Sequence, residues 1–340
     1  MRLSVYILKR AIYSIFTLLG LSIIVFTLAR VLPGDPARMA AGSRAPDWVV
    51  EQLRHQLNLD KPLYYQYFYW LSDLLRGDLG YSIVSRRSVT NDAIEYLPAT
   101  LELVIAAAIF NVVGALILGS LAGKYANRLV DNIIRVFSYI AISIPSFVWA
   151  IILQLVLGWW LNLFPTQGRI TEGITVPRAT GFYLIDSLLC GNLSAFLDTI
   201  WHLVLPAFAL SIGGMAQDAR IIRAGMVDNV EKDYILLMRS KGVPERLISF
   251  KYLLKPSIIP AVTVMGMDIA ALLGNAFLVE IIYNWPGLSR YGIVAMLNKD
   301  LNAIVAIVLV IGLVFAVANI IVDVIVSYLD PRIRLLEKGE

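Results

Sequence analysis

The residues that could do chemistry in this sequence are polar side chains set inside long apolar segments. Asp268 lies about eight residues beyond Pro260, which corresponds to roughly 12 Å along a helix. Asn275 follows on the same helical face. A carboxylate in an apolar segment is costly, so we expect Asp268 to face either a watery path or a neighbouring helix. Together with Pro145, which should kink or break its own helix, these two residues are the candidates for lining a pathway.

The other polar residues of the apolar segments have simpler interpretations. Asp218 has Arg220 and Arg223 close by in the sequence, which favours local pairing. His202 is expected to be a structural hydrogen-bond donor, and His55 a solvated residue of a surface helix. Because these are the only two histidines, little is available for a metal site, and we expect none.

No catalytic or phosphate-binding motif is recognisable. The nearest approach to a phosphate-binding loop, Gly119 to Lys124, lacks one residue between its glycines and has Tyr125 where Ser or Thr would hold Mg²⁺. Gly119 and Gly123 are better explained as a small-residue packing pair between helices. Cys190 is the only cysteine, so no intrachain disulfide can form. We therefore expect no enzyme activity and no cofactor on this chain.

The composition excludes an ordinary soluble domain. Of the 340 residues, 58% are hydrophobic and 16% are charged, and the mean hydropathy is +0.72. Soluble domains are about half apolar and about a quarter charged, so the apolar excess must face lipid. The net charge of +4 is small, and the basic residues form no stripe with interleaved aromatics, which argues against nucleic-acid binding.

Six segments hold the roughly 20 apolar residues that a helix needs to cross a bilayer. They are Ile7 to Leu32, Thr100 to Gly123, Ile133 to Leu161, Ile200 to Ile222, Ser257 to Ile282 and Asn302 to Leu329. Lipid offers no hydrogen-bond partner to an isolated strand, so the segments must be helices. The alternative of a cleaved signal peptide is disfavoured for the first, whose apolar run is too long. We predict an all-α integral membrane protein with six transmembrane helices.

Lysine and arginine concentrate beside the span ends on one side, which the positive-inside rule makes cytoplasmic. Both termini are then cytoplasmic. The chain divides into a first span (1–32), an extracytoplasmic segment (33–99) and a core of five spans (100–340) that includes a cytoplasmic loop (227–260). The positions predicted to be cytoplasmic are Lys124, Lys241 and Lys338, and those predicted to lie outside are Arg44, Arg178 and Lys299.

Three regions outside the spans should be folded. A helix can start at Pro46 and Asp47. The aromatic-rich stretch Leu63 to Leu75 predicts a helix that either lies at the outer membrane surface or packs as a small aromatic core. The stretch Thr180 to Leu197 is apolar but interrupted by polar residues and glycine, so it is predicted to be interfacial rather than spanning.

The loop at 227–260 should form two short helices. Asp228 and Glu231 can cap and charge the start of the first, and Gly242 suits its left-handed end. Pro244 sits where the second helix would begin, at a position that tolerates proline. Pro256 and Pro260 are expected to end that helix before the fifth span.

One face of the first short helix should be apolar, because Val230, Tyr234, Leu237 and Met238 fall on it. Such a face needs something to cover it. A partner protein and this chain's own spans are equally good covers on physical grounds alone.

This loop also carries a family resemblance. Asp233-Tyr234-Ile235, followed by Arg239-Ser240-Lys241-Gly242, resembles the cytoplasmic coupling loop of ABC-importer permeases, although Met238 and Ser240 stand where that family usually has alanine. Further motifs resemble the dipeptide/oligopeptide/nickel branch and follow its order along nearly the whole chain. They are Pro33-Gly34-Asp35-Pro36, Gly77-Asp78-Leu79-Gly80-Tyr81-Ser82, Leu97-Pro98-Ala99-Thr100-Leu101-Glu102-Leu103, Ser143-Ile144-Pro145-Ser146-Phe147, His202-Leu203-Val204-Leu205-Pro206-Ala207, Val279-Glu280, Trp285-Pro286-Gly287-Leu288 and Leu329-Asp330-Pro331-Arg332-Ile333-Arg334.

The resemblance implies a permease in the cell membrane that pairs with a second, similar permease. Two ATPase subunits would bind ATP and Mg²⁺ on the inside, and a substrate-binding protein would act outside. The loop residues implied to meet the ATPase are Asp233, Tyr234, Leu237, Met238, Arg239, Ser240, Lys241 and Gly242.

Within that loop, Tyr234, Leu237 and Met238 would enter a groove of the ATPase, with Arg239 and Lys241 as flanking charges. The cargo would be di- or oligopeptides, with oligosaccharides or nickel as alternatives. A secondary transporter is the rival class, but it would need ion-coupling carboxylates or unwound half-helices in paired positions, and the sequence offers neither.

Overall fold

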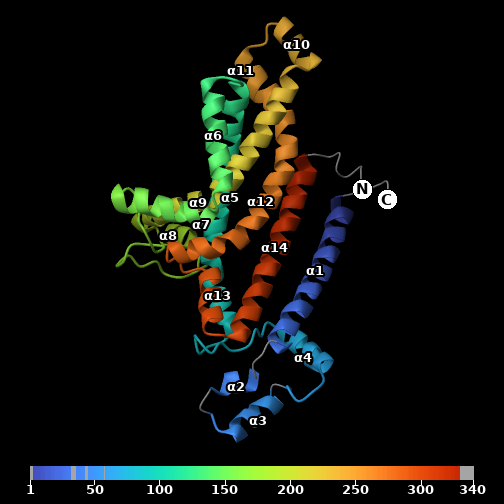
Figure 1. The fold of residues 1–340 in the computed structure, drawn as a ribbon, viewed down its shortest axis with the longest axis vertical. Helices are drawn as coiled ribbons and strands as arrows, with labels where there is room; N and C mark the ends of the chain where they lie inside the picture. Colours follow the sequence, from blue (N-terminus) through green and yellow to red (C-terminus); the bar gives the residue numbers. More distant parts are fainter. Residues whose placement is uncertain (1–2, 32–35, 43–44, 57, 330–340) are drawn as a thin grey trace. The chain divides into compact units, whose positions relative to one another are not determined.

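The computed structural model describes residues 3–31, 36–42, 45–56 and 58–329, and these are helical almost throughout (Figure 1). Its helices are α1 (Leu3–Val31), α2 (Pro36–Ala41), α3 (Asp47–Gln56), α4 (Leu63–Leu75), α5 (Val89–Lys124), α6 (Leu129–Ser143), α7 (Ser146–Leu153), α8 (Tyr183–Leu189), α9 (Leu193–Val230), α10 (Asp233–Ser240), α11 (Glu245–Leu247), α12 (Leu254–Ile282), α13 (Leu288–Leu297) and α14 (Leu301–Leu329). Two π-helical stretches, η1 (Gln154–Trp160) and η2 (Ile248–Leu253), continue α7 and α11.

Five of the described helices are long and apolar enough to cross a membrane, and a bent pair makes up to six. The five are Ile7–Arg30, Val89–Lys124, Leu193–Val230, Glu245–Ile282 and Leu301–Ser327. The pair consists of Leu129–Ser143 and Ser146–Trp160. The predicted all-α membrane fold is confirmed, with six spans when the pair is counted as one.

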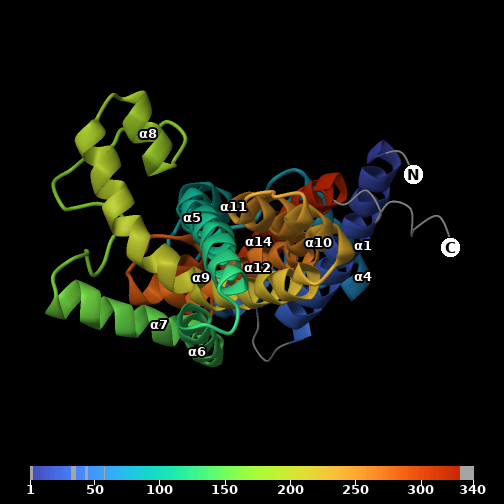
Figure 2. The same cartoon turned by 90° about the horizontal axis from the view of Figure 1, so that it is seen from above.

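The predicted third span is not a straight helix. The chain bends by 109° between α6 and α7. Figures 1 and 2 show this bend from two directions. Pro145 lies at the bend and Ile144 before it has an extended backbone. Proline cannot donate the backbone hydrogen bond that would continue α6, and it forces the preceding residue out of the helical region. The predicted break at Pro145 is therefore confirmed, and the segment predicted as one span, Ile133 to Leu161, consists of two helices on either side of it.

The described chain forms two compact units. The larger unit is Pro98–Gly287 with short pieces of both chain ends, and the smaller combines Leu8–Leu97 with Leu288–Val317. The predicted boundary at residue 99 lies close to the Leu97–Pro98 boundary, but Leu288–Val317 groups with the N-terminal part of the chain.

In the larger unit, α9 packs against α6, α7, α8 and α12. It also lies against α5, where glycines allow a close approach. A Cβ on Gly119 would stand 2.7 Å from the Cβ of Ile222, and one on Gly123 would stand 2.7 Å from the Cβ of Met226. The predicted small-residue packing pair is confirmed.

The stretch from Thr180 to Leu197, which is predicted to be interfacial, folds as α8 followed by the first residues of α9. Its polar residues hold the turns between these helices. Asp186 is buried and accepts hydrogen bonds from the Thr180 hydroxyl at 2.7 Å and from the Gly181 N–H at 2.9 Å. Burial alone would raise the pKa of Asp186, but these hydrogen bonds outweigh it and hold the pKa below its usual value.

The smaller unit contains the predicted aromatic helix, α4, with the bounds expected from the sequence. Tyr67 and Trp70 pack on Phe26, with ring centroids 5.3 and 5.4 Å apart, whereas Tyr64 and Phe68 are exposed. The predicted aromatic packing is therefore present, and the location at the outer membrane surface stays a prediction. α3 begins at Asp47, also as predicted.

Replacing Gly119 with leucine should destabilise the larger unit, because the added side chain has no room between α5 and α9. Overpacking of this kind costs about 1–3 kcal/mol. The matched control is Gly20→Leu, since nothing lies within 4 Å of a Cβ at Gly20. We expect the thermal unfolding midpoint in detergent to fall for Gly119→Leu and to stay near wild type for Gly20→Leu. Equal midpoints would show that the glycine contact is unimportant.

Candidate functional site

The loop at 227–260 forms a compact module beyond the ends of α9 and α12 (Figure 1). α10 ends at a turn in which Gly242 has a φ of +73°, the left-handed conformation predicted for it. The Gly242 N–H donates to Arg239 O and the Val243 N–H to Met238 O, which closes the helix end. Pro244 is the residue just before α11, one position earlier than expected.

The module starts and ends differently from the prediction. Asp228 lies within α9, which runs on to Val230, so it does not start the first short helix. The Asn229 amide bonds to Gly225 O and to the Ser257 hydroxyl, which ties this last turn of α9 to α12. Glu231 follows the end of α9, and α10 begins only at Asp233.

Pro256 and Pro260 do not end the second helix, contrary to expectation. The helix continues from Glu245 to Ile282 through the π-helical η2. In a π-helical turn, each backbone N–H bonds to the carbonyl five residues earlier instead of four. Such a turn can accommodate Pro256, which has no N–H to donate to the helix. The second short helix of the loop and the fifth span are consequently one helical rod.

α10 has one buried face and one exposed face. Ile235 is completely buried and packs in a cluster with Ile222, Met226 and Ile248. Met238 packs against the same cluster. The predicted apolar face of Tyr234, Leu237 and Met238 is therefore divided, because Met238 turns inward.

The exposed side of α10 holds Tyr234, Leu236 and Leu237, which are 38%, 53% and 54% exposed. Sequence reasoning missed Leu236, since five consecutive apolar residues mark no single helical face. The remaining predicted residues of the loop, Asp233, Arg239, Ser240 and Lys241, are exposed. Arg239 forms an ion pair with Glu245 at 2.7 Å across the Gly242 turn, which braces α10 against α11.

The three predicted pathway residues line one cavity of about 440 Å³ in the larger unit. Pro145 comes from the α6–α7 bend, whereas Asp268 and Asn275 come from α12. Much of the remaining wall is apolar and includes Phe147 and Leu278. The fold thus brings together residues that lie more than 120 positions apart in the sequence.

Asp218 does not pair with its neighbours in the sequence, and that prediction is wrong. Arg223 instead bonds to Asp131 of α6, with Nη2 and Oδ2 2.6 Å apart, and Arg220 lies over the ring of Tyr139. Residues two and five positions from Asp218 point away from its side of a helix, so neither arginine can reach it. Asp218 is fully buried, and neither of its carboxylate oxygens has a hydrogen-bond partner among the described residues.

Several motif residues form a buried polar network that sequence reasoning did not foresee. Arg169 forms a buried ion pair with Glu102 at 2.6 Å. The Thr100 hydroxyl donates to Glu280 at 2.6 Å, and a Cβ on Gly287 would collide with the Glu280 carboxylate. These contacts join α5, α12 and the intervening loop, so the motif residues are structural.

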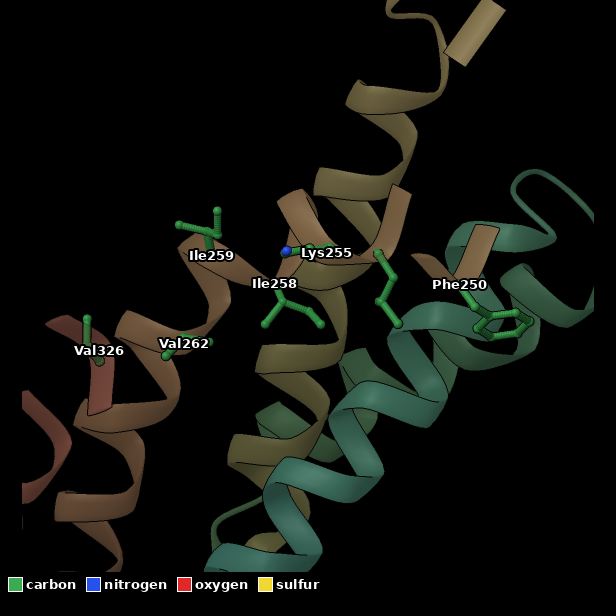
Figure 3. Close-up of a pocket in the computed structure, with 7 residues that line it drawn as sticks. Phe250, Lys255, Ile258, Ile259, Val262 and Val326 are labelled. Carbon is green, nitrogen blue, oxygen red and sulfur yellow. The ribbon is translucent and has the colours of Figure 1, made fainter. Parts of the chain in front are cut away.

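A second hollow of about 260 Å³ lies beside η2 and the start of α12 (Figure 3). η2 contributes Phe250 to its lining, α12 contributes Ile259 and Val262, and α14 contributes Val326. Among the described residues, Lys255 is the only charged one that lines this hollow, and none of them contributes a carboxylate to it. This hollow is an apolar groove, and the cavity at Asp268 is the more polar of the two.

The two histidines occupy the places expected for them. His202 is nearly buried, with Nδ1 2.9 Å from Asp198 O, and His55 is exposed on α3. Within the described part of the chain, no group of three or more His, Cys, Asp or Glu side chains could hold a metal ion.

Comparison with known proteins identifies the family. Residues 115–335 match the family described as binding-protein-dependent transport system inner membrane component, and residues 3–104 match its N-terminal part. The probable D,D-dipeptide transport system permease protein of Escherichia coli (strain K12) is 37% identical over 316 residues, which is 92% of this chain and 93% of the relative.

Two further relatives cover almost the whole chain. The di/tripeptide transport system permease protein of Pseudomonas aeruginosa (strain UCBPP-PA14) is 34% identical over 97% of this chain and 98% of its own length. The glutathione transport system permease protein of Escherichia coli (strain K12) is 34% identical with the same coverage. The chain therefore belongs to the inner membrane components of binding-protein-dependent transport systems, the permeases of ABC importers.

Proposed function

We propose that this permease carries di- and tripeptides across the cell membrane. The observation that supports this cargo most directly is that the three relatives compared above are named for dipeptides, di/tripeptides and glutathione. Oligosaccharides and nickel are the other cargoes considered. Only His202 and His55 could offer nickel an imidazole, and these lie in separate units of the fold.

A transport assay tests this cargo directly. The permease would be reconstituted with its partner subunits in liposomes and supplied with labelled dialanine, a labelled oligosaccharide or Ni²⁺. We expect ATP-dependent uptake of dialanine alone. Uptake of the oligosaccharide or of Ni²⁺ without dialanine uptake would overturn the assignment.

The α10–α11 module is proposed to dock on an ATPase subunit. Its exposed residues Tyr234, Leu236 and Leu237 form an apolar surface that needs a cover, and Ile235 anchors the module to the spans behind it. Asp233, Arg239, Ser240 and Lys241 would flank this contact as polar rim residues. ATP and Mg²⁺ would be bound by the ATPase and not by this chain.

The cavity that contains Asp268, Asn275 and Pro145 is proposed to be this chain's part of the translocation path. A single permease offers only one wall, so a second, similar permease would supply the other. The remaining partners are then a second ATPase subunit on the inside and a substrate-binding protein on the outside. Both termini of this chain would be cytoplasmic.

Gly242→Val should uncouple transport while leaving the protein inserted in the membrane. A residue with a Cβ is strained at positive φ by about 1–2 kcal/mol, and nothing lies within 4 Å of the added Cβ, so the change acts on the backbone turn alone. The control is Gly242→Asn, because asparagine tolerates this conformation. Lys241→Ala should also have little effect, since an exposed charge contributes little affinity.

The measurement is retention of the ATPase subunits in a pull-down, together with dialanine uptake, in membranes matched for permease amount. Gly242→Val should lose one or both, and Gly242→Asn should keep both. Wild-type behaviour of Gly242→Val would make the loop an ordinary linker.

The sidedness of the chain can be read from single cysteines in a Cys190→Ser background, because Cys190 is exposed and would otherwise react. An impermeant thiol reagent applied to sealed cells should label positions 178 and 299 and should not label positions 124 and 241. Positions 44 and 338, also assigned from the sequence, lie outside the described residues and can be probed in the same way. Labelling of position 241 from outside would contradict the proposed orientation.

A further inference from the structure

Three polar side chains from three different helices meet inside the larger unit. Asn111 lies on α5, Asp218 on α9 and Asp268 on α12. Gly214, one turn before Asp218 on α9, lies between them: a Cβ there would stand 2.6 Å from Asn111 Nδ2 and 3.6 Å from Asp268 Cβ. Because Gly214 has no side chain, the Asn111 amide and the Asp268 side chain can both lie against it.

These side chains are buried without partners. Asn111 and Asp218 are completely buried. Among the described residues, nothing hydrogen-bonds to either polar atom of Asn111, to either oxygen of Asp218, or to one oxygen of Asp268. Leaving a buried polar group unpaired costs about 1–3 kcal/mol, and more when the group is charged. Five unpaired atoms at one place indicate that the cluster is completed by something else.

The missing partner should be positively charged. Asp218 and Asp268 bring two carboxyl groups into the cluster, and Asn111 contributes no charge. Arg223 and Arg220, the nearest basic residues in the sequence, are held by Asp131 and Tyr139, and no ion pair to Asp218 or Asp268 occurs in the described part of the chain. In an apolar interior, a carboxyl group stays ionised only when a cation accompanies it, and otherwise it takes up a proton.

Of the three cluster residues, Asp268 lines the cavity at the α6–α7 bend, whereas Asn111 and Asp218 are buried and do not line it. Gly214 and Asp268 both line that cavity, and Asn275 lines it further along α12. The apolar residues Phe147 and Leu278 line other parts of it. A cavity of about 440 Å³ is far larger than one ion needs, since a water molecule occupies about 30 Å³. The occupant should therefore be an organic cation with an apolar part.

We propose that Asp268 binds the ammonium group of the cargo as it passes through the cavity, with Asp218 and Asn111 as the buried part of the same polar cluster. This inference rests on the proposed peptide cargo, whose free N-terminus is an ammonium. An ammonium donates three hydrogen bonds, and one oxygen of Asp268 has no partner among the described residues and could accept one of them. Asn275 and the apolar wall would contact the rest of the peptide.

Protection of a thiol placed in the cavity tests the proposal without the substrate-binding protein. Ser146 lines the same cavity, so Ser146→Cys in a Cys190→Ser background can be modified with a small thiol reagent in the purified permease–ATPase complex. We expect millimolar dialanine to slow the modification at least threefold. Propionyl-alanine, which has the same skeleton without the ammonium, should not slow it.

Asp268→Asn should abolish the protection by dialanine, and Asn111→Ala should weaken it without changing the charge of the site. Asp73→Asn, the same chemical change on the exposed face of α4, should leave the protection intact. Equal protection by dialanine and propionyl-alanine would overturn the proposal. Loss of the assembled complex in Asp268→Asn would also overturn it, because the residue would then be a structural interface group.

Two further arms separate the alternatives. If protection or uptake of dialanine requires Na⁺ and is lost when choline replaces it, the cluster holds a metal cation instead. If liposomes with the wild-type complex take up no dialanine at all, the peptide cargo itself is wrong. Normal dialanine uptake by Asp268→Asn would leave the peptide cargo standing and remove only the ammonium site.

Discussion

The close contact between α9 and its neighbours is the interaction on which the rest of the structure depends. Gly119 and Gly123 let α5 lie against α9, and Gly225 lets Ser257 of α12 do the same. Lipid is as apolar as the side chains, so helices in a membrane gain little from hydrophobic burial and associate through such tight packing and through hydrogen bonds. α9 also supplies Gly214 and Asp218, which means that the polar cluster is positioned by the same contacts.

The buried polar residues of the larger unit fall into two groups. Near the ends of the spans, Glu102 pairs with Arg169 and Glu280 accepts from Thr100, so that each carboxylate has a partner. Deeper along α9 and α12, Asp218 and one oxygen of Asp268 have none among the described residues. Buried polar groups in folded proteins usually have partners, so this unsatisfied pair is the place where a ligand is proposed to bind.

Much of this architecture could be predicted from the sequence, for identifiable reasons. Long apolar runs predict spans because lipid permits only helices, and Gly242 was predictable because a left-handed helix end strongly favours glycine. Asp268, Asn275 and Pro145 could be selected because each is unusual within a span. These three residues line one cavity because of the 109° bend between α6 and α7, and no local sequence pattern predicts that angle.

The wrong predictions share a physical cause. Closeness in sequence suggested arginine partners for Asp218, but direction around a helix decides which side chains meet. The exposed face of α10 was misassigned at Met238, and Leu236 was missed, because an apolar helix does not reveal which side meets the spans. The continuation of the helix past Pro256 depends on η2, and π-helical turns have no sequence signature.

The π-helical stretch Ile248–Leu253 also determines how this chain tolerates changes in length. Along the chain it lies between Gly242 and Asp268. It is part of one helical rod of 38 residues, Glu245–Ile282, which is about 57 Å long at the helical rise. Each residue of an α-helix turns the following side chains by about 100°. Loss of one residue from this stretch would leave the helix on either side of it folded. It would rotate Asp268 relative to the α10–α11 module and turn it away from the cavity. Insertions and deletions between these two points should therefore be far rarer among functional relatives than substitutions.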